Sequence, residues 1–360
     1  MQANAPRILY LAGRELSYSR NDVILRAFRR FGEVEVVGVK ERPASLLVSS
    51  LGIAIRAIPK LLFPAYDLVF VGFYGHLLML PTGLLARRPI LFDAFVSTHD
   101  TLSADRKRIS AGSPVGRLAF WLDQAACRLA THILLDTPRH AAFFAGAFDL
   151  MESKLSAIPV GCNEDIFFPR VRSQPGAYTQ VLYYSSYLPL HGAETVVRAA
   201  GLLKTEPVRF RLIGEGQDYA RVRSLAGQLQ LNNLEFIPFL PLERLPGELT
   251  AADIVLGGHF GSSEKAGRVV PGKVYQILAM ARPLVAGDTP ANRDLLVHSQ
   301  HAYLCPPCAP AALAEAILTL HRNPGLRDRL AVNGRTLYET ACSEAVITQQ
   351  LKSLVEALTS

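Results

Sequence analysis

The chain has 360 residues, of which 49% are hydrophobic and 19% charged, so it is long enough for roughly two domains and too apolar for a disordered protein. Its net charge of +7 is spread over short basic clusters, which favours phosphorylated small molecules or an anionic membrane surface as partners. Nucleic acid is not expected, because the sequence has no zinc-finger spacing, basic recognition helix or single-strand stacking pattern.

The cysteines and the N-terminus indicate a cytoplasmic protein. Five cysteines at irregular spacing do not form a disulfide framework, and no apolar segment typical of a secretion signal precedes the first strand-like run. The uncharged stretch 68–86 approaches the length of a membrane span. Gly72, Gly75 and Pro81 divide it, however, and favour a strand, a turn and the start of a helix over a transmembrane helix.

Short apolar runs alternate with helix-length amphipathic stretches, as in βα units around a parallel sheet. A helix is expected at about 20–31, where Val23, Ile24 and Ala27 share a stripe and Ser19 with Asp22 resembles a capping pair. The strands expected in the first half are 7–12, 33–39, 67–72, 89–93, 132–135 and 154–158.

Residues 163–178 are polar and rich in helix-breaking residues, so we place a domain junction there. The strands expected after it are 181–184, 208–213, 234–237, 253–256, 284–286 and 302–304. We therefore predict an α/β protein with two Rossmann-like, doubly wound domains, 1–168 and 175–341, facing each other across a cleft. Ligands of such sheets bind at the carboxyl ends of the strands.

A basic loop in the second half leads into a buried helix at 274–281. The loop reads Glu264-Lys265-Ala266-Gly267-Arg268-Val269-Val270-Pro271-Gly272-Lys273. Free N–H groups at the helix start, the positive end of its dipole, Arg268 and Lys273 would together hold a diphosphate. The alternative, that both cations are solvated loop residues, stays open.

A second loop of this kind, 185–192, lies between the strand 181–184 and a helix at 193–204. It contains Ser185, Ser186, His191 and Gly192, and small residues there let the backbone approach a ligand closely. His191 is either a phosphate donor or an exposed loop histidine. A third turn with Gly214 follows the next strand and is weaker evidence.

These loops make the second half resemble the family 4 glycosyltransferases of the two-domain GT-B fold. The resemblance rests on Pro189-Leu190-His191-Gly192, on the loop from Lys265 to Val274, and on Leu278-Ala279-Met280-Ala281-Arg282-Pro283. It covers most of residues 155–340. It implies a nucleotide-sugar donor as co-substrate, retention of the anomeric configuration, and no cofactor or metal ion.

The donor-site residues that the loops and the resemblance indicate are Ser185, Ser186, His191, Gly192, Gly214, Glu264, Lys265, Arg268, Val270, Lys273, Val274 and Gln276. Among them Lys273 is the candidate for stabilising charge on the departing diphosphate.

The first half is similar more faintly, through the motifs around Phe92-Asp93-Ala94-Phe95, His99-Asp100-Thr101, Asp105-Arg106-Lys107 and Asp136-Thr137-Pro138. The resemblance makes His99 the candidate residue facing the reacting sugar, with Asp100 as its neighbour. A structural loop histidine is the alternative for His99.

The chain also departs from the family. Relatives commonly carry two glutamates near the donor sugar, and these positions correspond to about Arg268 and to Gln276. The usual Arg and Lys of the first donor loop correspond to Ser186 and His191. These departures leave open a nucleotide-sugar-binding scaffold without transfer activity, and a nucleotide-sugar epimerase is a further alternative.

The first domain should bind the acceptor, a glycan or a lipid-linked glycan, with Arg20, Asn21 and His76 on loops beside the cleft. The segment 46–62 is either a basic amphipathic element that touches anionic lipid or a core helix kinked at Pro59. The resemblance implies that a final helix, within residues 342–360, returns to the first domain.

One further group of residues has zinc-like spacing: His298, His301, Cys305 and Cys308. They span a helix end, a strand and a turn where relatives have a loop, so we expect no metal site.

Overall fold

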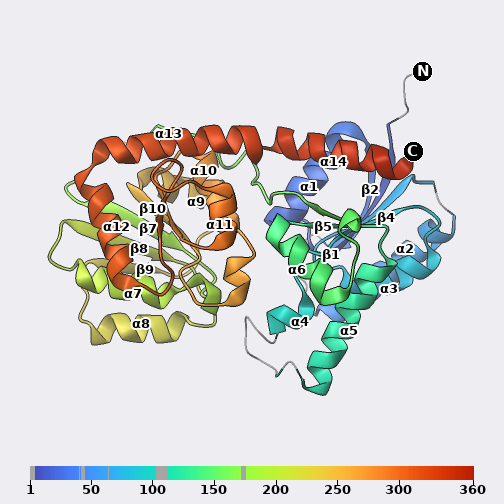
Figure 1. Cartoon of the computed structure of the whole chain (residues 1–360), viewed down its shortest axis with the longest axis horizontal. Coiled ribbons are helices and arrows are strands. Elements are labelled where there is room, and N and C mark those ends of the chain that lie inside the picture. Colours follow the sequence, from blue (N-terminus) through green and yellow to red (C-terminus); the bar gives the residue numbers. More distant parts are fainter. Residues whose placement is uncertain are drawn as a thin grey trace. The chain divides into compact units, whose positions relative to one another are not determined.

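The computed structural model describes residues 5–39, 41, 45–63, 65–102, 110, 112–171 and 176–360. The chain forms two compact units. Unit 1 comprises residues 1–163 together with 344–360, and unit 2 comprises 164–343. Each unit contains a parallel six-stranded sheet with helices between the strands (Figure 1).

The sheet of unit 1 has the strand order β2-β1-β3-β4-β5-β6. Its strands are β1 (Arg7–Glu15), β2 (Glu33–Val39), β3 (Leu68–Val71), β4 (Ile90–Asp93), β5 (His132–Leu135) and β6 (Leu155–Ala157). β1 lies between β2 and β3 in the sheet, so the connections after β1 and after β2 run in opposite directions across the sheet. The switch point of this sheet therefore lies between β1 and β3.

Helices cover both faces of the unit 1 sheet. Helices α1 (Ser19–Phe31) and α14 (Glu344–Thr359) share one hydrophobic core with the sheet. The opposite core contains side chains of α2 (Leu46–Leu62), α3 (His76–Leu85), α5 (Pro114–Leu129) and α6 (Pro138–Phe148). The inner strands β3, β4 and β5 are buried on both sides, which explains why they are largely apolar in the sequence, whereas the edge strand β2 is partly exposed.

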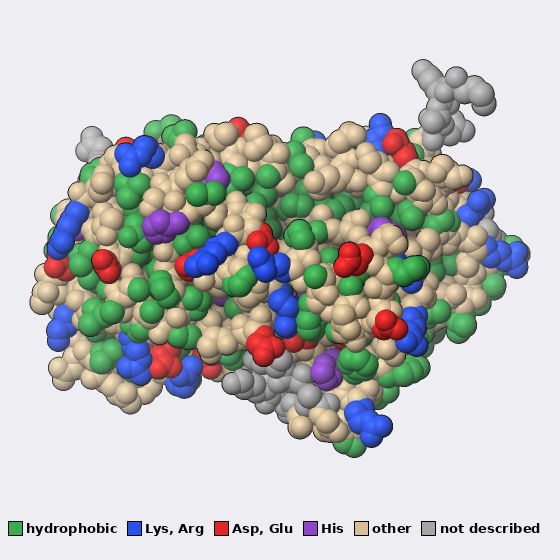
Figure 2. All heavy atoms as spheres, in the orientation of Figure 1, with side chains coloured by type: hydrophobic (Ala, Val, Ile, Leu, Met, Phe, Trp, Pro, Cys, Tyr) green, Lys and Arg blue, Asp and Glu red, His purple; other side chains and the backbone are tan. Residues whose placement is uncertain are grey.

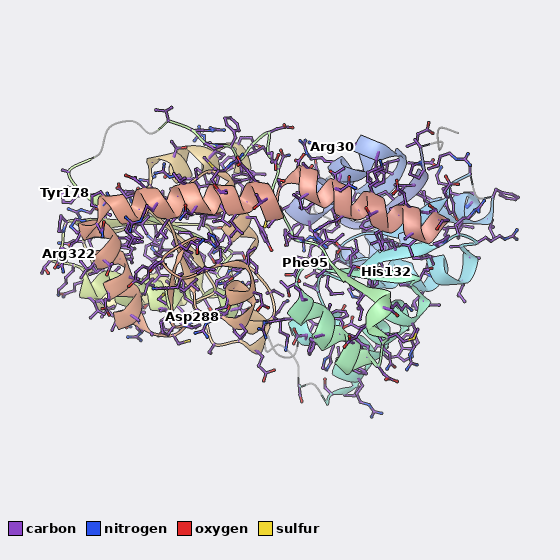
Figure 3. The ribbon with its side chains drawn as sticks, turned by 45° about the horizontal axis from the view of Figure 1, so that its top comes forward. Arg30, Phe95, His132, Tyr178, Asp288 and Arg322 are labelled. Carbon is purple, nitrogen blue, oxygen red and sulfur yellow. The ribbon has the colours of Figure 1, made fainter. Side chains whose placement is uncertain are left out.

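Helix α14 belongs to unit 1 although it follows all of unit 2 in the chain. Its Ile347, Leu351 and Val355 are fully buried in the core shared with α1. Glu344, at its first turn, accepts hydrogen bonds from Arg26 at 2.7 Å and Arg30 at 2.6 Å. Figure 3 labels Arg30 next to α14. The predicted return of a final helix to the first domain is confirmed.

Unit 2 repeats this plan with the strand order β12-β11-β10-β7-β8-β9. The strands are β7 (Thr179–Tyr184), β8 (Val208–Ile213), β9 (Leu234–Ile237), β10 (Ile254–Gly258), β11 (Leu284–Gly287) and β12 (Tyr303–Cys305). Its switch point lies between β7 and β10, because β7 is followed by β8 on one side and β10 on the other.

The helices of unit 2 are α7 (Ala193–Leu202), α8 (Tyr219–Gln228), α9 (Leu245–Ala251), α10 (Gly272–Ala279), α11 (Pro290–Leu295), α12 (Pro310–Arg322) and α13 (Pro324–Ala341). Helices α7, α8 and α12 form one large core with the sheet. Helix α10 packs on β10, β11 and α13 through its buried apolar stripe, Val274, Ile277 and Leu278.

The predicted α/β fold with two doubly wound sheets is confirmed, and each expected strand is present within three residues at either end. The capping pair was wrong: the N-cap of α1 is Tyr18 and no side chain caps it. Asp22 instead accepts a hydrogen bond from Asn163 at 2.7 Å. The stretch 68–86 contains β3 and α3, and within the described ranges no helix has the length and apolarity needed to cross a membrane.

Candidate nucleotide-sugar site

The loops predicted to bind the donor meet at the switch point of unit 2. The loop after β7 leads to α7, and the loop after β10 leads to α10. Both helices therefore begin at the carboxyl edge of the sheet, and neither has a side-chain hydrogen bond at its N-cap. Uncapped helix starts at this edge leave backbone N–H groups for an anionic ligand.

Glycines let these loops pack backbone against backbone. Gly192 has φ 66°, and a Cβ placed on it would lie 2.2 Å from the carbonyl carbon of Phe260. A Cβ on Gly214, which has φ 112°, would lie 2.0 Å from the carbonyl oxygen of Ser185. A larger residue at either position would separate the loops, so glycine is required there for steric reasons.

Two histidine rings stack between the loops. The rings of His191 and His259 are 5.8 Å apart and differ in plane by 6°. His191 Nδ1 is 2.7 Å from Ser185 Oγ. Burial, followed by the neighbouring Lys273, holds the pKa of His191 well below its ordinary value. Burial with Lys273 and Lys265 lowers the pKa of His259 to about 3.

Lys273, in the first turn of α10, lies in the same place. Its Nζ donates to the carbonyl oxygen of Tyr184 at 2.7 Å and lies 4.7 Å from the centre of the Tyr183 ring. Burial lowers its pKa from 10.5 to about 7. The ammonium thus has one carbonyl and the rings of Tyr183 and Tyr184 in place of water, and this loss of hydration is costly unless an anion binds to it.

We call Ser185, His191, His259, Lys265 and Lys273 the basic cluster. Lys265 is buried, and its charge lowers the pKa of both histidines. Two ammonium groups and two imidazoles are therefore held in a partly dry site beside two helix N-termini. This arrangement suits a ligand with two negative charges, such as a diphosphate.

The remaining predicted donor residues surround this cluster. Gln276 Oε1 accepts a hydrogen bond from Tyr184 Oη at 2.8 Å. Glu264 is exposed and lies 3.8 Å from Arg268. Ser186 is exposed, whereas the side chains of Val270 and Val274 are buried in the core, so these valines can offer a ligand only their backbone groups.

Sequence reasoning missed His259. It follows β10 in the segment Gly257-Gly258-His259-Phe260-Gly261, and glycines directly after a buried strand were the available signal. His259 is buried, and its Nδ1 has no hydrogen-bond partner among the described residues. The backbone of Ala266 bonds to the ring and stabilises its protonated form.

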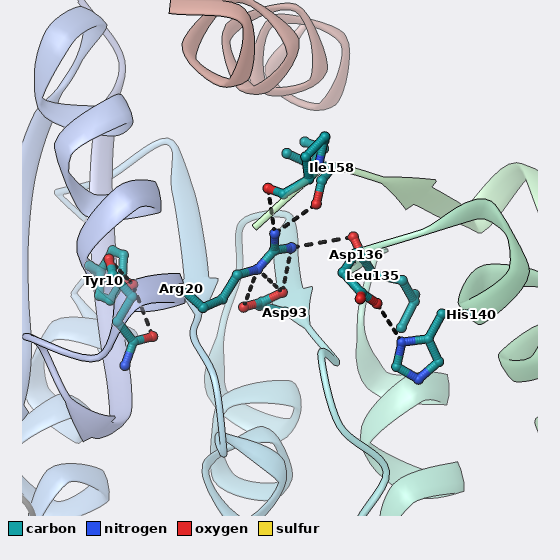
Figure 4. A network of polar contacts seen from close by, with 9 residues as sticks. Tyr10, Arg20, Asp93, Leu135, Asp136, His140 and Ile158 are labelled. Carbon is teal, nitrogen blue, oxygen red and sulfur yellow. Dashed lines mark hydrogen bonds and ion pairs between the residues drawn. The ribbon is translucent and has the colours of Figure 1, made fainter. Parts of the chain in front are cut away.

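Arg20 and Asn21, which were predicted to bind the acceptor, are buried and hydrogen-bonded inside unit 1. Arg20 is fully buried, and its guanidinium donates to Asp93 at 2.9 Å and to the Ile158 carbonyl at 2.7 Å (Figure 4). Asn21 is also fully buried and accepts from Tyr10 Oη. Both residues lie in the first turn of α1 and not on a loop, so this part of the prediction is corrected.

His76 likewise is buried, as the first residue of α3, and burial lowers its pKa. Its Nε2 lies 3.5 Å from Asp123 of α5. Asp123 also accepts from Ser97 Oγ at 2.6 Å and from the His99 amide at 3.0 Å. These contacts fix the short helix α4 (Thr98–Asp100), in which His99 is half-buried and Asp100 is buried.

The zinc-like spacing does not produce a cluster. The Nδ1 atoms of His298 and His301 accept hydrogen bonds from the nearby amides of Leu304 and Val297. Within the described parts of the chain, no three His, Cys, Asp or Glu side chains are grouped to hold a metal ion. The motif Asp105-Arg106-Lys107 lies outside the described residues.

Comparison with known proteins gives one family match, which lies in unit 2, and several glycosyltransferase relatives. The family described as glycosyl transferases group 1 matches residues 167–337. The putative colanic acid biosynthesis glycosyl transferase WcaI of Escherichia coli is 33% identical over 100 residues, which are 28% of this chain and 24% of that protein. The phosphatidyl-myo-inositol mannosyltransferase of Mycobacterium leprae is 29% identical over 182 residues, 49% of this chain and 47% of that protein. The matches therefore span between a quarter and a half of these curated relatives.

Solved structures match the whole chain. The Anabaena protein Alr3699/HepE, in complex with UDP and glucose, has a TM-score of 0.74 and 16% identity over 98% of this chain and 100% of that chain. Sucrose-phosphate synthase from Thermosynechococcus elongatus has a TM-score of 0.75 and 16% identity over 98% of this chain and 99% of that chain. At these identities the likeness shows the fold alone. The family match in unit 2, the glycosyltransferase relatives and the shared fold together support the predicted resemblance to the family 4 glycosyltransferases of the GT-B fold.

Proposed function

We propose that this protein transfers a sugar from a nucleotide-diphosphate sugar to a glycan or lipid-linked acceptor, in the synthesis of a bacterial cell-surface polysaccharide or glycolipid. The observation that carries the proposal is the basic cluster at the switch point of unit 2, which offers cations and backbone N–H groups to a diphosphate. The UDP bound in the structures of the Anabaena protein makes a uridine nucleotide the first donor to test.

The proposed chemistry depends on the leaving group. As the bond between the sugar and the diphosphate breaks, negative charge grows on the diphosphate oxygen, and Lys273 with the N-terminus of α10 stabilises that charge. A diphosphate oxygen takes the proton of the acceptor hydroxyl as the new bond forms on the same face of the sugar, so the anomeric configuration is retained. No metal ion or cofactor takes part in this proposal.

Two side chains of unit 1 are proposed as catalytic residues. His99 faces the reacting sugar, and Asp100 lies next to it in α4. The capping of α4 by Asp123 supports this role, because it fixes the backbone that carries His99. His76 contacts Asp123, which holds the backbone of α4, and because His76 is buried we assign it this supporting role and not acceptor binding.

A binding protein without transfer activity is the second candidate. One observation favours it: Gln276, at the position of a family glutamate, uses its carbonyl oxygen to accept from Tyr184 and has no negative charge for sugar or ribose hydroxyl groups. A transferase assayed without its acceptor would bind the donor and release little nucleoside diphosphate, as a binding protein does. Donor binding and donor hydrolysis therefore have to be measured together, with and without acceptors.

The test is a calorimetric titration with UDP and GDP, followed by incubation with UDP- and GDP-sugars in the presence of lipid extracts or glycan acceptors. We expect micromolar to millimolar binding of one nucleotide, and release of the nucleoside diphosphate that depends on the acceptor. Binding without release would favour the scaffold, and an epimerised sugar would favour the epimerase. If no nucleotide binds, the proposed function is wrong.

We further propose that the protein works at the cytoplasmic face of a membrane, where a lipid-linked acceptor would be located. The segment 46–62, which the sequence left between a lipid-contacting element and a core helix, supports this. As α2 it buries Ile53, Ala57 and Leu61 in the core of unit 1 and leaves an apolar outer face exposed.

A further inference from the structure

Helix α2 exposes large apolar side chains that its packing does not explain. Leu47, Val48, Leu51 and Ile55 are between 59% and 72% exposed, and Phe63 just after the helix is 80% exposed. The inner stripe of α2 already fills the core of unit 1. A surface helix normally places polar side chains on its outer face, so an outer face of this composition indicates a contact beyond the described chain.

Helix α5 shows the same feature on the same side of the sheet. Its inner residues Ala126 and Cys127 lie in the core that also contains α2 and α3. Its outer face carries Val115, Leu118 and Trp121, which are 53% to 63% exposed. Trp121 is the only tryptophan in the chain. Tryptophan is enriched where protein meets the headgroup region of a bilayer, because its ring is apolar and its N–H is polar.

The two exposed faces belong to one surface. Helix α3 packs against both α2 and α5 and adds Leu84, which is 80% exposed. We call the outer faces of α2, α3 and α5 the apolar platform. In Figure 2, hydrophobic and basic side chains meet over the lower end of α5.

The charges on the apolar platform are of one sign. Arginines are exposed on α2, directly after α3 and on α5, namely Arg56, Arg87, Arg88, Arg117 and Arg128. The three helices are described throughout, and their single carboxylate, Asp123, is buried. Lys60 is not counted with the exposed cations because it pairs with Glu35.

We infer that the apolar platform, with Trp121 on α5 and Leu51 on α2 as its main apolar contacts, docks unit 1 on a bilayer that contains anionic phospholipid. The apolar side chains enter the boundary between headgroups and acyl chains, and the arginines bind lipid phosphates, as in other interfacial helices. A second copy of this chain fits less well, because two such platforms would bring arginine against arginine. The inference deepens the membrane location proposed above and rests on it.

The single tryptophan makes the test direct. The full-length protein is titrated with vesicles of phosphatidylglycerol and phosphatidylcholine, and with vesicles of phosphatidylcholine alone, while Trp121 emission and co-sedimentation are recorded. We expect the emission to shift to the blue and the protein to sediment only with the anionic vesicles. Leu118→Gln and Leu51→Gln should each lower the partition coefficient by about tenfold, as expected when one large apolar side chain is no longer buried. Arg117→Gln should lower it by about fivefold.

Phe239→Gln is the matched control, since Phe239 is 78% exposed in unit 2 and lies outside the apolar platform. It should bind vesicles as the unchanged protein does. Nucleoside-diphosphate titration of each variant shows that it is folded. An absence of vesicle binding in a protein that still binds nucleotide would overturn the docking surface and leave the proposed transfer intact. A blue shift that follows protein concentration without vesicles would assign the platform to a contact between copies, and would also overturn the inference.

Discussion

Lys273 is the residue on which the proposed donor site depends most. Its Nζ has one carbonyl partner and a pKa lowered to about 7. A bound phosphate would therefore stabilise the charged form of this side chain. We expect Lys273→Ala to weaken nucleoside-diphosphate binding by roughly ten- to a hundredfold, the size of a charge-assisted hydrogen bond. Lys204→Ala, at an exposed lysine of the same unit, is the control and should leave the dissociation constant unchanged in calorimetry.

The lowered pKa of Lys273 predicts a pH dependence of binding. Below pH 7 the free protein already carries the proton, whereas above pH 7 it has lost it. A diphosphate favours the charged form and raises this pKa, so binding above pH 7 must take up a proton. The dissociation constant should therefore rise with pH, by up to about tenfold per unit.

Lys273→Arg keeps its charge over this range and should flatten the profile. Calorimetry in buffers of different ionisation enthalpy measures the proton uptake itself. Equal profiles for the two proteins would show that another group is responsible.

The residue scale is also where sequence reasoning was least complete. Lys273 and His191 could be predicted because a cation or histidine beside glycine and a helix start is a local pattern. Arg20 could not, since a charged residue after a strand normally faces solvent, and only the fold places Asp93 and three backbone carbonyls around it. His259 was missed because His191, the ring against which it stacks in the candidate site, is distant in the sequence.

At the scale of elements, the loop joining β7 to α7 is held by Gly192. Its φ of 66° and the 2.2 Å approach of Phe260 leave no room for a side chain. Gly192→Ala should lower the free energy of unfolding by roughly 2 kcal/mol or more in urea denaturation. Gly272→Ala is its counterpart at the start of α10, where an added Cβ meets nothing within 4 Å, and it should change stability little. Similar losses for both would contradict this account.

Strands and helices were predictable because burial determines the spacing of apolar residues in the sequence. The fully buried strand β3 is a continuous apolar run, and α1 shows a clear apolar stripe. Their ends were less predictable, since the N-cap of α1 depends on the backbone at Tyr18 and not on a capping side chain. The outer face of α2 could not be separated from a core-facing stripe, because both are apolar in the sequence.

At the scale of the whole molecule, α14 follows unit 2 in the chain and packs against α1 and the sheet of unit 1. Leu351 is fully buried between α14 and the sheet of unit 1. Leu351→Ala should cost about 2–5 kcal/mol of stability. Hydrogen exchange should become faster in α1, β1 and α14 and remain unchanged in β7, β8 and β10. Faster exchange in both units would mean that they unfold together.

The crossing of α14 also sets an order for synthesis. The ribosome makes the strands and first helices of unit 1 before unit 2, yet the helix that covers one side of the unit 1 sheet is made after all of unit 2. Unit 2 has all its elements once α13 has been made, whereas the residues of unit 1 that α14 covers are then still exposed to solvent. Unit 1 is therefore begun before unit 2 and completed after it, and the apolar residues of α1 that face α14 stay exposed to solvent until that helix has been made.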